Sequence, residues 1–425
     1  MGVGMAQTKR ALQVGMGGRI GKMKTSQKNE PMQDVILVGS GLIGGTLACA
    51  LAKNGLKITI IDQLDPHIPP ISDGRSFALS RSSFNVLSKL GIWETLDEVT
   101  PITAIHTSDG VLPRWIEYHE EDVKGGPLGY VVDSALLKSK ILKKVMSFKN
   151  IMLHAPSSVS RLERTAYHAL LETDRGERVK APLCIAADGK FSTLRTWAQI
   201  PLKKWSYDHI AIVCNMAHTL PHANRAFEHF LPSGPLAFVP RPGNESGLVW
   251  SVEKEKAEVY LALSSKEFAE EVQALFGDSL GTFTLSSQRW SYPLDVCLPK
   301  RLIDTRLALA GDAAHTFHPV AGQGLNVGFR DVAALAEVLS DAFSLGLDLG
   351  SSSVLNRYQK WRQMDILSMT LLTDGLVRVF STQSRALARA RSFGFGIVKH
   401  CTPLKHFMIR HAMGTTGKVP SLARD

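Results

Sequence analysis

One short segment, Gly39-Ser40-Gly41-Leu42-Ile43-Gly44, constrains the fold of this chain more than any other feature. An apolar run from Asp34 to Val38 precedes it, a stretch of helical composition from Gly44 to Asn54 follows it, and a β-branched run then ends at Asp62. This order predicts a strand, a tight turn, a helix and a second strand, which together form the βαβ unit of a dinucleotide-binding domain.

The spacing of the glycines explains why such a turn suits a dinucleotide. Gly39 permits the tight turn, Gly41 lets the backbone approach a pyrophosphate, and Gly44 lets the helix pack closely on the strand. The N-terminus of the helix favours phosphate charge, and a carboxylate at Asp62 is placed to hold ribose hydroxyls. The predicted contacts are Gly39, Gly41, Leu42, Ile43, Gly44 and Asp62. The pattern by itself fits FAD, NAD or NADP.

A second motif begins at Gly311-Asp312, directly after the apolar run Leu307 to Ala310, and continues in Gly322-Gln323-Gly324-Leu325-Asn326. A carboxylate at a strand end can accept hydrogen bonds from sugar or ribityl hydroxyls, and the glycines let the backbone lie against a flat ring. A helix is expected from Leu325 to Leu339, and the N–H groups at its start would stabilise negative charge on a reduced flavin.

Asp312, His315 and His318 also have a spacing that resembles a set of metal ligands. No further carboxylates or cysteines gather nearby in the sequence, and the glycine-rich run that follows has no role in a metal site. We therefore predict no metal, and we expect the two histidines to pack and form hydrogen bonds beneath a cofactor.

A third motif, Asp188-Gly189, again follows an apolar strand and is followed by Arg195. An Asp-Gly pair by itself indicates only a turn. Its position between the other two motifs is what makes it a candidate for the same site.

Composition excludes several classes of protein. A chain of 425 residues that is 44% apolar can bury the cores of a cofactor domain and a second lobe. The net charge of +10 is spread along the chain and concentrates only at its ends, so no nucleic-acid partner is predicted. The five cysteines are far apart and form no C-x-x-C pair, which argues against a disulfide framework or a zinc site. The uncharged stretch Val35 to Ala52 contains too many glycines for a spanning helix.

Residues 1–31 form a basic extension that contains no acidic residue before Glu30, and we expect it to be disordered. It fits either a presequence of the mitochondrial type or a start codon placed too early in the gene. The absence of a signal-peptide core argues against secretion.

Taken together, the motifs resemble the FAD-dependent aromatic hydroxylases of the para-hydroxybenzoate hydroxylase fold, and more closely the branch that hydroxylates ubiquinone precursors. The likeness runs from about Gln33 to the C-terminus, and its most specific part is the run from Gly311 to Asp331. Further segments that carry it are Asp73-Gly74-Arg75, Gly129-Tyr130-Val131-Val132, Tyr292-Pro293-Leu294 and Ala412-Met413-Gly414. The chain departs from the branch at Asp133-Ser134 and at Lys190-Phe191.

The resemblance assigns roles to residues of all three motifs. It implies that the Gly39 turn binds the FAD diphosphate, Asp62 the adenosine ribose and Arg75 the central part of the cofactor. It also implies that Asp312 holds the ribityl chain, while Asp188 and Arg195 belong to a motif that the family links to FAD and NADPH. The expected lining of the isoalloxazine and its pocket is Pro319, Gly322, Gln323, Gly324, Leu325 and Asn326, with Phe238 and Trp250 as a roof. Gly311 is a further expected contact of the cofactor. No side chain is assigned as an acid or a base.

The fold class that follows is α/β with an α+β second lobe. A Rossmann-like parallel-sheet domain for FAD is expected in residues 32–100, 128–200 and 299–345, and an interleaved antiparallel-sheet domain for the substrate in 101–127 and 201–298. Residues 346–425 form a helical C-terminal region. Short runs from Ile151 to Glu172, with a further strand leading to Ala187, favour a small antiparallel sheet.

The resemblance implies a monooxygenase that uses FAD, NADPH or NADH, and O2 to hydroxylate a polyprenylated phenol in ubiquinone biosynthesis. Two alternatives stay open: a flavin-dependent reductase or dehydrogenase of a prenyl lipid, and a non-catalytic prenyl-binding scaffold. The implied location is the cytoplasm, or the mitochondrial matrix in a eukaryote, with peripheral contact to the inner membrane and to other quinone-biosynthesis enzymes. Basic and apolar residues between Arg385 and Arg410 fit either an amphipathic helix on that membrane or a solvated helix face.

Overall fold

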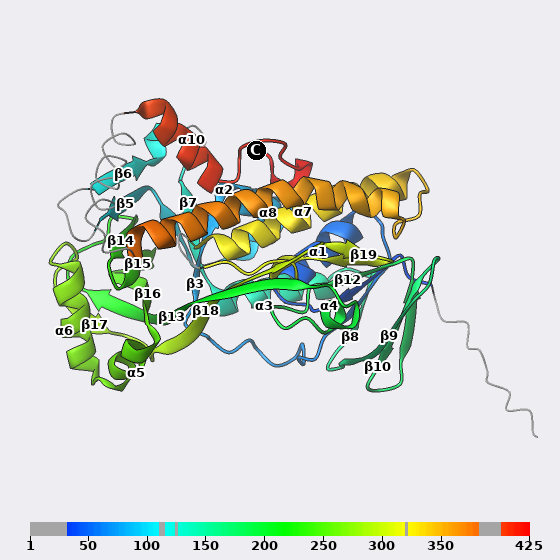
Figure 1. Ribbon diagram of the computed structural model, residues 1–425, viewed down its shortest axis with the longest axis horizontal. Coiled ribbons are helices and arrows are strands. Elements are labelled where there is room, and N and C mark those ends of the chain that lie inside the picture. Colours follow the sequence, from blue (N-terminus) through cyan, green and yellow to red (C-terminus); the bar gives the residue numbers. More distant parts are fainter. Residues whose placement is uncertain (1–31, 110–114, 124–125, 319–321, 382–400) are drawn as a thin grey trace, which may run out of the picture.

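The computed structural model describes residues 32–109, 115–123, 126–318, 322–381 and 401–425. Its centre is a six-stranded sheet in the order β19-β20-β12-β1-β2-β8 (Figure 1). All neighbours in this sheet are parallel except the edge pair β19 and β20. Its strands are β1 (Val35–Val38), β2 (Ile58–Ile61), β8 (Ile151–His154), β12 (Leu183–Ala186), β19 (Ile303–Asp304) and β20 (Leu307–Leu309).

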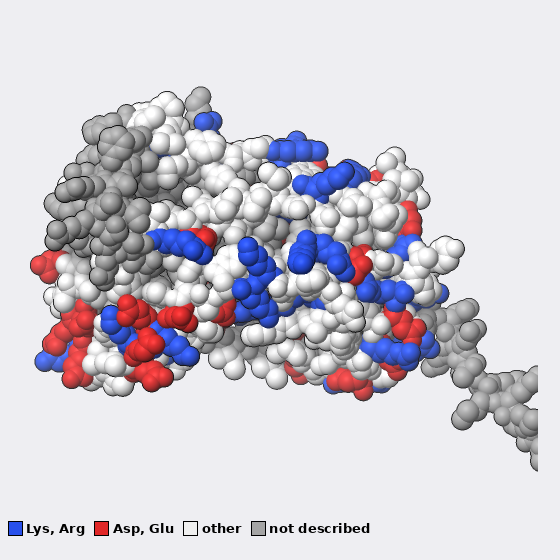
Figure 2. Space-filling view, viewed as in Figure 1, with Lys and Arg blue, Asp and Glu red and all other residues white. Residues whose placement is uncertain are grey.

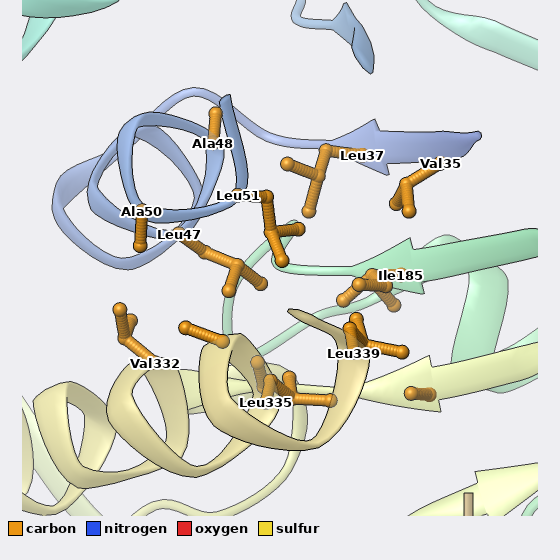
Figure 3. Packing of buried hydrophobic residues seen from close by; sticks show 14 of the residues in the cluster. Val35, Leu37, Leu47, Ala48, Ala50, Leu51, Ile185, Val332, Leu335 and Leu339 are labelled. Carbon is orange, nitrogen blue, oxygen red and sulfur yellow. The ribbon is translucent and has the colours of Figure 1, made fainter. Parts of the chain in front are cut away.

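The parallel strands are short and almost wholly apolar because helices cover the sheet. The covering helices include α1 (Leu42–Lys53), α3 (Ser134–Met146), α7 (Gln323–Ser344) and α8 (Ser352–Ser381). In Figure 3, Leu47 and Leu51 of α1 lie close to Leu335 and Leu339 of α7 beside the strands. This apolar contact joins the N-terminal and C-terminal parts of the cofactor half in one core.

Two small sheets flank the parallel sheet. One is antiparallel and contains β9 (Val159–Arg164), β10 (Ala169–Thr173) and β11 (Arg178–Ala181). The other has the order β3-β7-β4 and contains β3 (Ser76–Ser80), β7 (Gly129–Asp133) and β4 (Val99–Ile102). The short helices α2 (Arg81–Lys89) and α4 (Thr193–Trp197) belong to the same half.

The prediction that Ile151–His154 joins the small antiparallel sheet is wrong. This strand is β8, and it pairs with β2 in parallel at the edge of the central sheet. The reason is the preceding helix α3, which carries the chain back along the sheet so that the next strand runs in the same direction as its neighbour. The strands β9, β10 and β11 do form the antiparallel sheet.

The second half of the molecule is a large mixed sheet in the order β17-β13-β16-β15-β14-β5-β6, with β18 also paired to β13. Its strands are β5 (Ala104–Ser108), β6 (Trp115–His119), β13 (Leu202–His218), β14 (Arg225–Leu231), β15 (Gly234–Arg241), β16 (Glu245–Glu253), β17 (Phe283–Leu285) and β18 (Trp290–Pro299). The helices α5 (Lys254–Ala262) and α6 (Ser265–Phe276) pack on one face of it. Acidic side chains gather at the lower left of Figure 2, where these two helices lie.

Contacts between the halves fix the large sheet against the cofactor half. The hydroxyl of Tyr292 on β18 donates to the carbonyl oxygen of Asp73 at 2.7 Å. A side chain at Gly74 would collide with the ring of Trp290, because its Cβ would lie 2.0 Å from that ring. The long helix α8 crosses the molecule and contacts both β14 and β19 (Figure 1). After it, α10 (Thr402–Ala412) packs Ile409 against residues of β4 and β14.

No helix of the described residues is long and apolar enough to cross a bilayer. The basic extension of residues 1–31 lies outside the part of the chain that the structure describes, as does most of the basic run that begins at Arg385. Of that run, α10 is described. It carries Lys405, which pairs with Asp122 at 2.6 Å, and Phe407, whose surface is 55% exposed.

Candidate active site

Four strands of the central sheet end at the same edge, and a residue singled out by the sequence follows each of them. Gly39 follows β1, Asp62 follows β2, Asp188 comes shortly after β12, and Asp312 comes shortly after β20. Because the four strands are parallel, their carboxyl ends lie side by side. The structure therefore brings the three sequence motifs together at one edge, where α/β sheets bind their ligands.

In the glycine turn, packing within the protein requires glycine at two positions, whereas the third position borders open space. A Cβ at Gly39, where φ is +100°, would lie 2.4 Å from the carbonyl oxygen of Ala187, and a Cβ at Gly44 would lie 1.9 Å from that of Gly39. At Gly41, by contrast, no described atom lies within 4 Å of an added Cβ. The space beside Gly41 fits a ligand that approaches the backbone closely.

The N-terminus of α1 can bind an anion. Its N-cap is Gly41, and among the described residues no side chain caps the first turn. The N–H groups of that turn, with the helix dipole, favour a phosphate in this place. Nearby, Asp62 accepts hydrogen bonds from the Ser40 hydroxyl at 2.7 Å and from the Leu64 amide at 2.8 Å, which fix the orientation of its carboxylate.

The first and last motifs meet through the side chain of Ile43. A Cβ at Gly311 would lie 2.9 Å from Ile43, and a Cβ at Gly328 on α7 would lie 2.6 Å from it. Both positions therefore need glycine for α1 to pack this closely on α7 and on the turn that contains Asp312. Leu42, which precedes Ile43, is half-buried in the same core.

Asp312 occupies a position that few carboxylates have, because it is both exposed and poorly solvated. Its side chain is open to solvent, yet desolvation raises the pKa of its carboxyl group, against the opposing effects of His315 and Arg75. An accessible carboxylate at this edge of the sheet can accept hydrogen bonds from hydroxyl groups of a ligand.

Arg75 lies close enough to Asp312 to lower its pKa, and neighbouring side chains hold Arg75 in position. It pairs with Asp73 at 2.5 Å, and its guanidinium lies 5.3 Å from the ring of Tyr292. Among the described residues, its buried Nε atom has no hydrogen-bond partner, and the same is true of Oδ1 of Asp188. Unpaired buried polar atoms are costly, so these two atoms, like the space beside Gly41, fit a polar ligand.

The third motif links the other two. Oδ2 of Asp188 accepts a hydrogen bond at 2.8 Å from the amide of Thr193, the first residue of α4. Arg195 on α4 donates to the carbonyl oxygen of Ala313 at 2.8 Å and to that of Lys190 at 2.7 Å. Arg195 therefore positions the turn of Asp312 relative to Asp188.

The start of α7 lies beside β3. Gly322 adopts the left-handed conformation, with φ at +60°, and its added Cβ would lie 3.7 Å from Ala78. Gln323 is buried, Leu325 is half-buried, and an added Cβ at Gly324 would meet no described atom within 4 Å. Pro319 lies outside the described residues.

Asn326 has its side chain fully engaged inside the protein. Its amide group donates to the carbonyl oxygen of Ala78 at 2.9 Å, and its oxygen accepts from the Ser80 amide at 2.9 Å and the Ser83 hydroxyl at 2.7 Å. The side chain fixes the start of α7 to the end of β3. Only the backbone of Asn326 is left to face a cofactor.

A buried ionic network beneath the site was missed by the sequence analysis. Asp331 on α7 is fully buried and accepts hydrogen bonds from His315 at 2.6 Å, Arg362 at 2.7 Å and the Gly311 amide at 3.0 Å. Burial alone would raise its pKa, but His315 and Arg362 outweigh burial and lower it. Asp331 stays charged and holds the Gly311 turn in place. The sequence offered one signal, since Asp331 ends the most specific run of the resemblance.

Among the described residues, no cluster of three or more histidine, cysteine or carboxylate groups could hold a metal ion. His315 instead bonds to Asp331 and stacks on Phe317, with ring centroids 4.9 Å apart. His318 lies 5.1 Å from the ring of Tyr207, and desolvation lowers its pKa to about 4.

The expectation that Phe238 and Trp250 form a roof over the cofactor is wrong. Both side chains are fully buried on the other face of the large sheet, in a cluster with Phe268 of α6. Strand residues alternate between faces, so Ala237, Val239 and Val249 are the ones that face the cofactor half.

Comparisons with known proteins agree with this geometry. The family described as an FAD binding domain matches residues 32–365. The crystal structure of p-nitrophenol 4-monooxygenase PnpA from Pseudomonas putida DLL-E4 superposes with a TM-score of 0.75 at 17% identity, over 91% of this chain and 99% of that one. The class is therefore an FAD-binding protein with the fold of an aromatic-ring monooxygenase.

Curated relatives assign the chain to a narrower group within this class of FAD-binding proteins. Ubiquinone hydroxylase UbiL of Rhodospirillum rubrum is 41% identical over 389 residues, which cover 91% of this chain and 90% of the relative. The 3-demethoxyubiquinol 3-hydroxylase of Escherichia coli is 30% identical over 392 residues, which cover 91% and 99%. The chain belongs to this family of FAD-dependent monooxygenases, and FAD is its cofactor.

Proposed function

We propose that this protein hydroxylates the aromatic ring of a polyprenylated phenol in ubiquinone biosynthesis, with NADPH or NADH as the reductant and O2 as the source of oxygen. The single observation that carries the proposal is the meeting of the Gly39 turn with the Gly311 turn through Ile43. One extended cofactor can then contact both motifs. The two hydroxylase relatives named above support the substrate class.

The proposed contacts with FAD follow the edge of the central sheet. Gly39, Gly41, Leu42, Ile43 and Gly44 would receive the diphosphate at the start of α1. The ribose would meet Asp62, and the middle of the cofactor would meet Arg75, Asp188, Gly311 and Asp312, two of which have unpaired buried atoms. Gly322, Gln323, Gly324, Leu325 and Asn326 would lie along the flavin ring.

Bound FAD would supply the oxygen chemistry, taking electrons from the nicotinamide and activating O2 for transfer to the ring. The chain's own contribution is to position the cofactor and the substrate and to exclude water. The N–H groups at the start of α7 would stabilise negative charge on the reduced ring. The apolar residues Ala78, Val131, Ala226 and Val239 line the junction between the two halves and keep it dry.

We infer that the protein also contacts a membrane surface through α10 and the basic run before it, because its substrate carries a prenyl chain. Phe407 and the basic residue Arg410 are both exposed on α10, whereas Lys405 pairs with Asp122. An exposed aromatic side chain among cations is typical of interfacial helices. Association with the other enzymes of quinone biosynthesis at the inner membrane is part of the same proposal.

The test of the function uses the FAD-loaded protein with NADPH or NADH and a short-chain prenylphenol. We expect O2 uptake that depends on the phenol, and a product heavier by one oxygen atom in mass spectrometry. Reduction of the phenol-loaded enzyme without oxygen transfer would favour a reductase instead. In the native organism, deletion of the gene should lead to accumulation of a quinone precursor that lacks one ring hydroxyl.

A further inference from the structure

Strand β14 of the large sheet has two faces with different surroundings. Phe227 and His229 point toward α6, where their rings lie 5.2 Å and 4.8 Å from the ring of Phe276. The alternate residues Ala226, Glu228 and Phe230 therefore point to the opposite face, toward the cofactor half. Glu228 is the one ionisable side chain of these three.

The neighbours of Glu228 along the strand place it beside the proposed flavin pocket. Ala226 belongs to the same cluster as Ala78, and Ala78 lies against Gly322 at the start of α7. On the other side, Phe230 packs against Val377 of α8. Residues two apart on a strand are separated by about 7 Å. Glu228 thus lies two residues, about 7 Å, along the strand from Ala226, whose cluster includes the Ala78 that contacts the start of α7.

Among the described residues, Glu228 has no hydrogen-bonding or ion-pair partner. In the sheet it lies opposite Ala237 on β15 and beside Thr107 on β5. Within the described part of the chain its carboxyl group makes no hydrogen bond and no ion pair, although the side chain is only half-buried. Desolvation, with no opposing charge, raises the pKa of Glu228 to about 7. Such an arrangement costs stability, which is typical of a group that is kept for a ligand.

We propose that Glu228 accepts a hydrogen bond from the phenolic hydroxyl of the ring substrate and so orients that ring in the pocket. The proposal rests on the proposed function, because it needs a substrate with a ring hydroxyl. If the proton moves fully, the phenol O–H bond breaks, an O–H bond forms at a carboxylate oxygen of Glu228, and the bonding pair stays on the phenol oxygen. The ring then becomes richer in electrons, which favours its attack on an electrophilic oxygen atom.

The experiment measures binding rather than turnover. FAD-loaded protein without NAD(P)H is titrated with a short-chain prenylphenol and with the matching prenylbenzene that lacks the hydroxyl, and the flavin absorbance reports binding. We expect the native protein to prefer the phenol by about 10- to 100-fold, the range for a hydrogen bond to a charged group. Glu228→Leu should bind both compounds equally. Glu228→Gln should keep part of the preference, because its amide oxygen still accepts a hydrogen bond.

The matched control is Glu117→Gln on β6, which lies two strands away from β14 in the same sheet. Glu117 is also a half-buried glutamate, but it pairs with His106 at 3.3 Å on the other face of the sheet. It should keep the full preference for the phenol. If Glu228→Leu retains the native preference while it still binds FAD, the proposal is overturned and the function stands. If the native protein binds FAD but no phenol, the proposed function fails, and the inference fails with it.

Discussion

Two carboxylates in this protein have opposite environments. Asp331, beneath the cofactor site, has no exposed surface and is held by His315, Arg362 and the Gly311 amide. Glu228, on the face of the large sheet, has no partner among the described residues. The pKa of the first is lowered and that of the second is raised to about 7. A buried charge with partners is thus part of the scaffold, whereas an unpaired one is available to a ligand.

Among substitutions of these acidic residues, Asp331→Ala should change the stability of the protein most. The substitution leaves the buried guanidinium of Arg362 without its main partner and releases the Gly311 turn. We expect the free energy of unfolding to fall by about 3–5 kcal/mol, the usual result of breaking a buried ion pair. Chemical denaturation measures this loss, and flavin absorbance should show reduced FAD content. A variant as stable as the native protein would remove Asp331 from the scaffold.

A smaller effect, of opposite sign, is expected from Glu228→Gln. The native protein holds the Glu228 proton up to a pH of about 7, whereas the unfolded chain releases it near the ordinary value of 4.5. The folded state therefore binds more protons in this interval, and its stability falls as the pH rises through it. Glutamine removes that cost. At pH 8 the variant should be more stable by about 1–3 kcal/mol, and the gain should vanish toward pH 4.5.

Chemical denaturation at the two pH values tests the sign of this change in the free energy of unfolding. A variant that is less stable than the native protein at pH 8 would mean that Glu228 is stabilised by its surroundings, and the contrast with Asp331 would be lost.

The smallest effect is expected from Asp341→Asn, a control on the same helix as Asp331. Asp341 pairs with Arg357 at 2.8 Å, but about half of each side chain is exposed. Exposed ion pairs contribute at most about 1 kcal/mol, so the unfolding midpoint should hardly move. A loss as large as that of Asp331→Ala would show that α7 is sensitive to any change of charge, rather than to the buried network.

Much of the cofactor-binding edge could be predicted from the sequence, because the motifs that form it are local. The Gly39 turn, Asp62 at the end of its strand and the helix after Gly322 each depend on residues adjacent in the chain. The structure adds that Asn326 is engaged by Ala78, far away in the sequence.

The substrate side was harder to predict because its signals are tertiary. Phe238 and Trp250 have the size expected of a roof, but the alternation of their strands turns them toward α5 and α6. The face of the large sheet that is buried away from the cofactor half is the one covered by α5 and α6, and these helices follow later in the chain. The same pairing decides that Glu228 faces the cofactor half, and a single glutamate in a strand carries no signal of this in the sequence.

In the proposed complex, the edge of the parallel sheet binds FAD through the space beside Gly41. Titration of the native protein and of Gly41→Ala with FAD, followed by flavin fluorescence, tests it directly. No described atom lies within 4 Å of an added Cβ, so the variant should fold and melt like the native protein. We expect one FAD per native chain and at least about tenfold weaker binding in the variant, since the methyl group enters the space of the diphosphate. Equal affinity for FAD in both proteins would contradict the claim.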